Sequence, residues 1–510
     1  MKGMNEREVR LRLGGSGADF QLATHPLAGV VEGKPQTTEE DRIHYDTPDL
    51  ALHKKGVACF LAQKGTQWQQ QIGPGFSGTK GCNKRVSQPI DEGRLDREKL
   101  KGGAVKGCLG RVKPKEIEEL FALNHTQTRW GLKYPDESRI RLTIEQGSLK
   151  MGRSKTRFCD LVLEQKSGDQ ARFYQTLLTL LHDLQPALEG LSPLERGFAK
   201  RDPDTIPVEF CQTDLPLPDD SAEEAFVRIN TSLLKRMRAG QTGVVHGGPR
   251  VRLGGLTELV RSVGLLREVF GLYHFLLPGD IRVELDGELA WLEEEIVAVF
   301  GWERFLAGTL APFMAQFPDY GALIALGEAA GEQLEKGYRR LNKLLESFRF
   351  ARLTLGLSHW LECRGWRPMM DLPQKRHMAQ PARELAREAL SRHHHQLRKR
   401  GGKPAKGKEV VWGSLVSDAA LLGAATELFS GLFSGKGRDA FITTLEELRV
   451  RLDALEEVAA GEARFADILP DKEEAVVHLI KGWIGARRER RTRDCVEAWK
   501  GFGSHKSYWL

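Results

Sequence analysis

The sequence predicts an α+β chain in which an antiparallel β domain comes first and an all-α domain follows. Between Glu6 and about Lys200, short runs alternate charged and apolar residues with a period of two and are separated by Gly-rich turns. From Ser221 onward, apolar residues instead recur at helical spacing. A chain of 510 residues is too long for one hydrophobic core, so several domains are expected.

The composition excludes several classes of protein. Apolar residues make up 40% of the chain, but no uninterrupted apolar run approaches the roughly 18 residues of a membrane-spanning helix. The N-terminus lacks the apolar segment of a signal peptide. Seven scattered cysteines fit free thiols in a reducing cytoplasm and argue against a zinc cluster or a disulfide framework. A net charge of +7 permits an anionic partner.

Three predicted strands carry the functional signal. The first, residues 6–13, places Glu6, Glu8, Arg10 and Arg12 on one face and Val9, Leu11 and Leu13 on the other. Residues 139–145 and 158–166 show the same pattern, and their charged faces hold Arg139, Arg141, Glu145, Asp160, Glu164 and Lys166. These faces either meet bulk water or line the inside of a barrel. In a barrel, carboxylates would hold a divalent metal ion and basic groups would hold phosphate oxygens.

The motifs of this half resemble those of the CYTH family of triphosphate tunnel enzymes. The matching stretches are Glu6-x-Glu8-x-Arg10, His44-Tyr45-Asp46-Thr47-Pro48-Asp49, the acidic strand ending at Glu164-Gln165-Lys166, and Glu195-Arg196-Gly197-Phe198. The resemblance implies an eight-stranded antiparallel β tunnel barrel over residues 1–200. It also implies hydrolysis of inorganic triphosphate with Mg²⁺ or Mn²⁺.

The resemblance implies a role for each site residue. Metal ligands are expected at Glu6, Glu8, Asp160 and Glu164, and the catalytic residues among them are Glu6, Glu8 and Glu164. Phosphate oxygens are expected to bind Arg10, Lys166 and Arg196, although Arg196 could instead pair with its neighbour Glu195. An exposed strand face is the alternative interpretation for Glu6 and Glu8.

Several positions depart from the CYTH pattern. Phe60 and Ala62 stand where two arginines are expected. The lysine expected just before Gly73 is also missing. Arg141 and Val162 stand where two glutamates are expected. A cation beside a metal position repels the metal, so weak or absent hydrolysis is predicted.

A Pro- and Asp-rich connector over residues 201–220 separates the halves, and Ser221 and Glu224 then form a capping box that begins a helical domain over residues 221–510. Its stretches Val244-Val245-His246, Arg250 to Arg267, Phe350-Ala351-Arg352-Leu353 and His359-Trp360-Leu361-Glu362 resemble the CHAD domain, which implies a helical bundle that binds polyphosphate. His246 and Arg250 are the substrate-binding residues expected here. Because Trp412 to Glu427 lacks basic residues, clusters at 392–408 and 487–493 are an alternative groove, against an interpretation as solvated helix ends.

Three functions remain open from the sequence: a metal-dependent inorganic triphosphatase, a non-catalytic polyphosphate- or nucleotide-binding module, and a scaffold with decayed sites. The expected partner is inorganic triphosphate or polyphosphate, and neither a membrane nor nucleic acid is expected. The expected location is the cytoplasm, with polyphosphate granules as one place within it.

Overall fold

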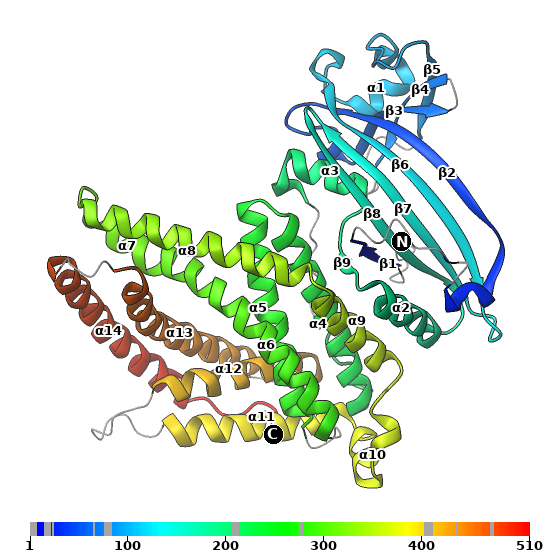
Figure 1. Cartoon of the computed structure of the whole chain (residues 1–510). Helices are drawn as coiled ribbons and strands as arrows, with labels where there is room; N and C mark the ends of the chain where they lie inside the picture. The colour runs from blue at the N-terminus through cyan, green and yellow to red at the C-terminus, as the bar shows by residue number, and fades with distance from the viewer. Residues whose placement is uncertain are drawn as a thin grey trace. The chain divides into compact units, whose positions relative to one another are not determined.

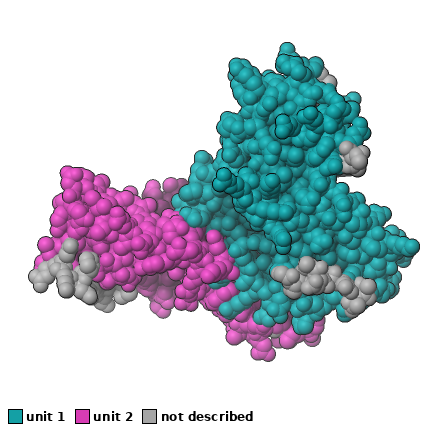
Figure 2. Space-filling view, turned by 45° about the horizontal axis from the view of Figure 1, so that its top comes forward, with its two compact units in different colours: residues 1–209, 238–255, 344–359 teal, residues 210–237, 256–343, 360–510 magenta. Residues whose placement is uncertain are grey.

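A computed structural model describes residues 8–14, 22, 25–64, 67–75, 84–206, 214–274, 279–401, 412–434, 437–469 and 474–510. The chain forms two compact units. Unit 1 consists of Met1–Glu209, Arg238–Gly255 and Leu344–His359, and unit 2 of Phe210–Met237, Leu256–Lys343 and Trp360–Leu510 (Figure 2). Two segments from the helical half of the sequence therefore belong to the unit that holds the β-sheet.

Unit 1 is built on an antiparallel sheet whose described strands follow the order β5-β4-β3-β2-β6-β7-β8-β1-β9 (Figure 1). The strands are β1 (Glu8–Arg12), β2 (Val31–Asp46), β3 (Val57–Lys64), β4 (Gln67–Pro74), β5 (Val86–Ile90), β6 (Glu118–Lys133), β7 (Arg139–Met151), β8 (Ser154–Ser167) and β9 (Ala187–Glu189). Helices α1 (Gly103–Leu109), α2 (Gln170–Leu184) and α3 (Pro193–Arg201) complete residues 1–209 of this unit.

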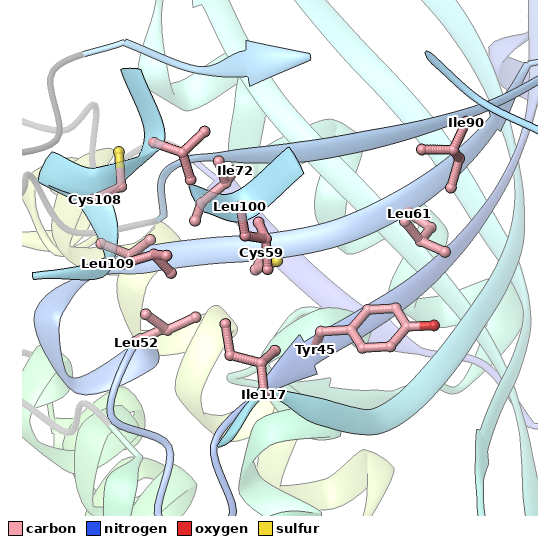
Figure 3. Packing of buried hydrophobic residues seen from close by; sticks show 12 residues of the cluster. Tyr45, Leu52, Cys59, Leu61, Ile72, Ile90, Leu100, Cys108, Leu109 and Ile117 are labelled. Carbon is pink, nitrogen blue, oxygen red and sulfur yellow. The ribbon is translucent and has the colours of Figure 1, made fainter. Parts of the chain in front are cut away.

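The predicted fold class, an antiparallel β domain followed by a helical domain, is confirmed. The eight-stranded closed barrel needs correction, because the described sheet has nine strands and is not closed. The end strands β5 and β9 each pair on one side only. β5 contains Pro89, which has no backbone N–H to donate, and β9 is only three residues long. Strands β3 to β5 also bury their apolar residues in a cluster of their own with α1, including Cys59, Leu61, Ile72 and Leu109 (Figure 3).

Two further patterns in the sequence are resolved by the structure. Residues Lys115 to Phe121 have helical spacing, but only a 3-10 turn, Pro114–Glu116, forms there and β6 begins at Glu118, since a short apolar run fits either structure. Of the described cysteines, Cys59, Cys159, Cys363 and Cys495 are not in disulfides, but Cys108 is disulfide-bonded, which the scattered spacing did not predict. Scattered spacing in sequence does not show which cysteines approach each other in the fold.

Unit 2 is helical. The helices of the second half of the chain are α4 (Ala222–His246), α5 (Pro249–Leu272), α6 (Gly279–Arg304), α7 (Ala311–Met314), α8 (Gly321–Leu345), α9 (Phe348–Glu362), α10 (Leu372–Met378), α11 (Ala382–Gly401), α12 (Trp412–Leu428), α13 (Arg438–Ile468) and α14 (Glu474–Gly503). A π-helical segment, Phe305–Leu310, joins α6 to α7. The capping box predicted at Ser221 and Glu224 is confirmed, since the Ser221 Oγ accepts from the Glu224 N–H at 3.2 Å.

The core of unit 2 includes Phe305, Phe313, Phe465 and Ile480. By length and composition alone, one described helical stretch, Gly279–Met314, could cross a membrane. Core helices of globular domains meet the same criteria, so this is weak evidence.

Strand β1 is expected to be essential for the sheet of unit 1, because Leu11 is fully buried between β8 and β9. Replacing a buried leucine with alanine removes apolar contacts and leaves a cavity, so Leu11→Ala should destabilise unit 1 by about 2–5 kcal/mol. Urea unfolding of the full chain would measure the shift. Leu253→Ala, at an exposed position of unit 1, is the control and should change stability by less than about 1 kcal/mol.

Candidate functional site

The three strands predicted to carry charge lie side by side in the order β7-β8-β1. Their register places Glu8 opposite Glu164, and Glu164 opposite Arg141. A second cross-strand row holds Arg12, Asp160 and Glu145. We call the charged residues of these strands the charged strand face: Glu8, Arg10, Arg12, Arg141, Glu145, Asp160, Glu164 and Lys166. The predicted alternation is confirmed, because Val9, Leu11, Leu161 and Leu163 on the opposite face are buried.

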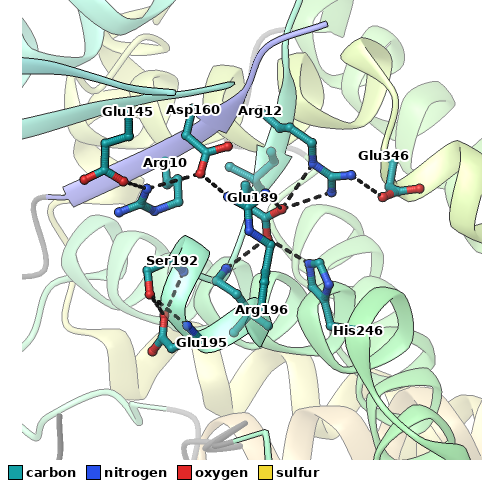
Figure 4. Close-up of polar contacts among 12 residues, drawn as sticks. Arg10, Arg12, Glu145, Asp160, Glu189, Ser192, Glu195, Arg196, His246 and Glu346 are labelled. Carbon is teal, nitrogen blue, oxygen red and sulfur yellow. Dashed lines mark hydrogen bonds and ion pairs between the residues drawn. The ribbon is translucent and has the colours of Figure 1, made fainter. Parts of the chain in front are cut away.

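Arg10 lies between two carboxylates of the charged strand face (Figure 4). Its Nη1 is 2.6 Å from Glu145 Oε2 and 3.3 Å from Asp160 Oδ2. Asp160 also pairs with Arg196 of α3. Burial raises the pKa of Asp160 to about 6, although Arg196 and Arg10 oppose this shift. The Asp160 side chain is completely buried, and among the described residues its Oδ1 has no hydrogen-bond partner.

Glu189, at the end of β9, gathers two guanidinium groups and one imidazole. Its carboxylate lies 2.8 Å from His246 Nε2, 3.1 Å from an Arg12 nitrogen and 3.5 Å from Arg196 Nη1 (Figure 4). The Glu189 side chain is fully buried, and burial alone would raise its pKa. The hydrogen bond and charge of His246, with Arg196 and Arg12, outweigh burial and lower the pKa to about 2. Glu189 is therefore ionised at neutral pH.

Glu164 is held by two cations. Its Oε2 is 3.3 Å from Arg141 Nη1, and its other oxygen pairs with Lys166. Glu8 is less engaged, since its side chain is 52% exposed and its nearest guanidinium nitrogen, on Arg10, is 3.7 Å away. Burial raises the pKa of Glu8, Arg10 lowers it, and Glu164 and Glu145 raise it further.

An aromatic cluster fills another part of the sheet, where the CYTH pattern would place basic residues. His44 is buried and stacks on Phe121 with ring centroids 4.9 Å apart, and its ring lies 5.4 Å from Phe60. Phe198 of α3 packs against Phe121 edge to face. Burial lowers the pKa of His44 to about 3, so it is neutral at physiological pH. Phe60 and Ala62, which stand where the CYTH pattern has two arginines, are thus buried apolar residues in place of charged ones.

Helix α3 brings Arg196 to the site. Ser192 and Glu195 form a capping box, in which Ser192 N–H donates to Glu195 Oε2 at 2.7 Å, and Pro193 occupies the first turn. Arg196 pairs with Asp160 and Glu189, and its guanidinium lies 5.3 Å from the centre of the Phe158 ring. The alternative in which Arg196 pairs with Glu195 is therefore not what the structure shows.

A cavity of about 990 Å³ lies beside these residues, and all of its lining belongs to unit 1. Its basic and imidazole side chains are Arg12, Arg157, Arg196, Lys200 and His246, and among the described residues Glu346 is the one lining carboxylate. Apolar lining comes from residues such as Leu13, Leu149, Phe158 and Val245. Arg12 Nη1 lies 2.7 Å from Glu346 Oε1. We call this space the basic cavity.

The structure brings most predicted site residues together, with two exceptions. Glu6 lies outside the described residues. Arg250 is exposed and does not line the basic cavity, whereas His246 does.

The described residues do not fit the expected Mg²⁺ or Mn²⁺. Among them, no group of three or more His, Cys, Asp or Glu side chains is placed to hold a metal ion. Asp160 and Glu164, two of the expected ligands, are paired with cations instead.

The basic clusters of the helical half are largely paired within unit 2. Arg400 lies 2.9 Å from Asp418, and Arg488 pairs with Glu462. Arg487 donates to the Gly308 carbonyl at 3.1 Å and lies over the Trp483 ring. Lys403, Lys406 and Lys408 lie outside the described residues. These contacts favour structural roles for the described members of the two clusters.

Comparison with known proteins identifies the helical half. Residues 228–466 match the profile of the CHAD domain. This segment is a CHAD domain. The resemblance predicted for the helical half from its motifs is thus confirmed, and His246 lies within the CHAD domain. No curated protein matches the chain in sequence.

Several solved structures resemble the chain. The CHAD domain from the plant Ricinus communis is 20% identical, with a TM-score of 0.49, and the match covers 58% of this chain and 96% of that domain. PptA from Streptomyces chartreusis is 16% identical, with a TM-score of 0.35 and coverage of 54% and 97%. HpAC1 from Hippeastrum, described as an adenylyl cyclase candidate with a dominant triphosphatase activity, is 12% identical, with a TM-score of 0.24 and coverage of 38% and 95%.

Sequence reasoning missed several residues of the site: Glu189, Arg157, Lys200 and Glu346. Glu189 stands just before the Gly190-Leu191-Ser192-Pro193 turn, in a strand too short for its alternation to be recognised. Glu346 lies 334 positions from Arg12, and no local pattern signals such a contact. For Arg157 and Lys200, the one signal in the sequence is that each is a basic residue close to a recognised motif.

Glu189→Gln should destabilise unit 1 by about 3–5 kcal/mol at pH 7, because Arg12, Arg196 and His246 would lose a buried, charged partner. Because the pKa of Glu189 is lower in the folded chain than in the unfolded chain, its ionised form stabilises the fold above the unfolded pKa of about 4.3. This stabilisation is lost as the pH falls toward the folded pKa. The difference from the natural chain should therefore shrink between about pH 4 and pH 2.

Urea unfolding of both forms at a series of pH values would measure this difference. Glu137→Gln, at an exposed turn position, is the matched control. A cost for Glu189→Gln that stays constant down to pH 2 would contradict the assigned ionisation.

Proposed function

We propose that this protein binds a phosphate-chain anion, such as inorganic tripolyphosphate or the end of a longer polyphosphate, in the basic cavity of unit 1. The observation that carries the proposal is the charge of the lining: in the described part of the chain, Arg12, Arg157, Arg196 and Lys200 line the cavity together with one carboxylate, Glu346. A phosphate chain carries several negative charges along its length. It would therefore neutralise cations that the protein itself leaves in excess.

Two of these cations are available without breaking an ion pair. Among the described residues, Arg157 and Lys200 have no carboxylate within ion-pair distance, and Lys200 donates to the Thr156 hydroxyl. Arg12 and Arg196 are anchored by the buried Glu189, so they are preorganised. Preorganised donors lose little side-chain entropy when an anion arrives.

The family resemblances support this ligand class. The CYTH-like motifs imply a triphosphate ligand, and the CHAD resemblance implies polyphosphate. The pairing of the basic clusters in unit 2 leaves unit 1 as the better candidate for the binding site. Nucleotides share the phosphate chain and are a related ligand to test.

Hydrolysis of the phosphate chain is a second candidate function, and the state of Glu8 favours it. Of the carboxylates on the charged strand face, Glu8 has the most exposed side chain. Its pKa is also raised. A carboxylate with a raised pKa is a better base for activating water than an ordinary one. The remaining carboxylates of this face are held by arginine or lysine, so slow turnover is expected.

Binding can be tested by titrating tripolyphosphate into the full chain by calorimetry. The double variant Arg157→Ala, Lys200→Ala should bind about tenfold or more weakly, since a charge-assisted hydrogen bond contributes about 1.5–3 kcal/mol. The double variant should also show a flatter dependence on salt, because fewer counterions are exchanged.

The control for this titration is Lys150→Ala, Lys155→Ala, which removes the same charge from exposed strand positions outside the cavity lining. An undiminished affinity in the test variant would place the site elsewhere. No binding by the natural chain at low salt would leave only the scaffold function.

Hydrolysis can be tested by phosphate release from tripolyphosphate. If Glu8 acts as the base, Glu8→Gln should lower the rate by 100-fold or more, on the order of the contribution of general-base catalysis. Because Glu8 does not line the basic cavity, this role requires the phosphate chain to extend from the cavity along β1 to Glu8. Binding of the chain by the cavity should therefore persist in Glu8→Gln. A rate unchanged in Glu8→Gln would rule out this role.

A further inference from the structure

We infer that cationic side chains take the place expected of a divalent metal, so that the phosphate chain binds as the metal-free anion. This inference rests on the proposed function. It goes beyond it, because the CYTH resemblance implies a metal-dependent site. The evidence is the way in which the carboxylates of the site are already neutralised.

The first cross-strand row shows a replaced metal position. Glu8, Glu164 and Arg141 lie opposite one another on β1, β8 and β7. Arg141 and Lys166 approach the Glu164 carboxylate from two sides. A metal ion at Glu164 would have to displace both groups and lose part of its own hydration.

The second row is closed to a metal for the same reason. Arg10 joins Glu145 to Asp160, and Arg196 joins Asp160 to Glu189. These side chains are largely buried, so their attraction is poorly screened by water. Displacing an arginine from this cluster would leave a buried charge without a partner.

Among the described residues, the carboxylates of the two cross-strand rows are already neutralised. Glu8, Glu145, Asp160 and Glu164 meet Arg10, Arg141, Lys166 and Arg196, while Glu189 and Glu346 share Arg12. A divalent cation would add charge to rows that have no negative excess in the described part of the chain. An anion in the basic cavity instead meets Arg157 and Lys200, which these carboxylates do not neutralise.

Magnesium should consequently act on the ligand and not on the protein. Mg²⁺ binds phosphate oxygens readily, and a chelated phosphate chain carries less negative charge for Arg157 and Lys200 to attract. The affinity for tripolyphosphate should therefore be highest when free Mg²⁺ is absent.

The first test is calorimetric titration of tripolyphosphate into the full chain, in EDTA and in an excess of Mg²⁺. An affinity in EDTA that equals or exceeds the affinity in Mg²⁺ supports the inference. Binding that appears only with Mg²⁺ overturns it and leaves the proposed function standing. Absence of binding in both buffers overturns the proposed function, and this inference with it.

The second test uses Mn²⁺ alone, followed by electron paramagnetic resonance. The natural chain should not bind Mn²⁺ saturably, and saturable binding would overturn the inference. The double variant Arg141→Glu, Lys166→Gln should gain a Mn²⁺ site, because three carboxylates would then share the first cross-strand row. Failure of this folded variant to gain one would also count against the inference.

The matched control is Arg153→Glu, Lys155→Gln, which makes the same charge changes at exposed positions of the β7–β8 turn and β8. It should leave the protein unable to bind Mn²⁺. Circular dichroism would confirm that each variant is folded. If the test variant does not fold, the titration of the natural chain in EDTA and Mg²⁺ still decides the question.

Discussion

The Glu189 carboxylate is the interaction on which the site depends. It has no exposed surface, and a buried ionised carboxylate is very costly unless cations and hydrogen bonds compensate for its lost hydration. Arg12, Arg196 and His246 provide this compensation from β1, α3 and α4. Because β9 is only three residues long, these ion pairs supplement its few backbone hydrogen bonds. They also fix the cations that border the basic cavity.

The sheet of unit 1 has one region of aromatic packing and another region of ion pairs. Around His44 and Phe121, aromatic rings fill the space beside α3, while Arg196 on the same helix reaches the charged strand face. Gly197 makes this possible, because a Cβ atom there would lie 2.5 Å from the Phe121 ring. Helix α3 therefore contributes Phe198 to the aromatic cluster and Arg196 to the charged strand face. The cavity remains where neither the rings nor the ion pairs fill the space.

The sequence predicted the strands better than their assembly. Alternation in residues 6–13, 139–145 and 158–166 identified the charged faces, because a period of two leaves one face buried and the other charged. The same pattern says nothing about which edges pair. Closure into an eight-stranded barrel rested on the CYTH resemblance, and the described nine-stranded sheet is not closed. Contacts such as Arg12 to Glu346 join residues 334 positions apart and depend on how the whole unit folds. The Arg141 departure, by contrast, was visible in the sequence, and its ion pair with Glu164 gives it a physical meaning.

The pattern of ion pairs also bears on turnover. Catalysis requires interactions that become stronger as charge develops in the transition state. Interactions that are equally strong with the bound substrate and with the transition state raise the affinity but not the catalytic rate. Arg10 and Arg141 are already engaged with internal carboxylates, so their response to new charge on a ligand would have to weaken existing pairs. Arg157 and Lys200 have no carboxylate partner among the described residues, but they lie near the surface, where water competes for a phosphate. This distribution favours holding a polyanion over cleaving it.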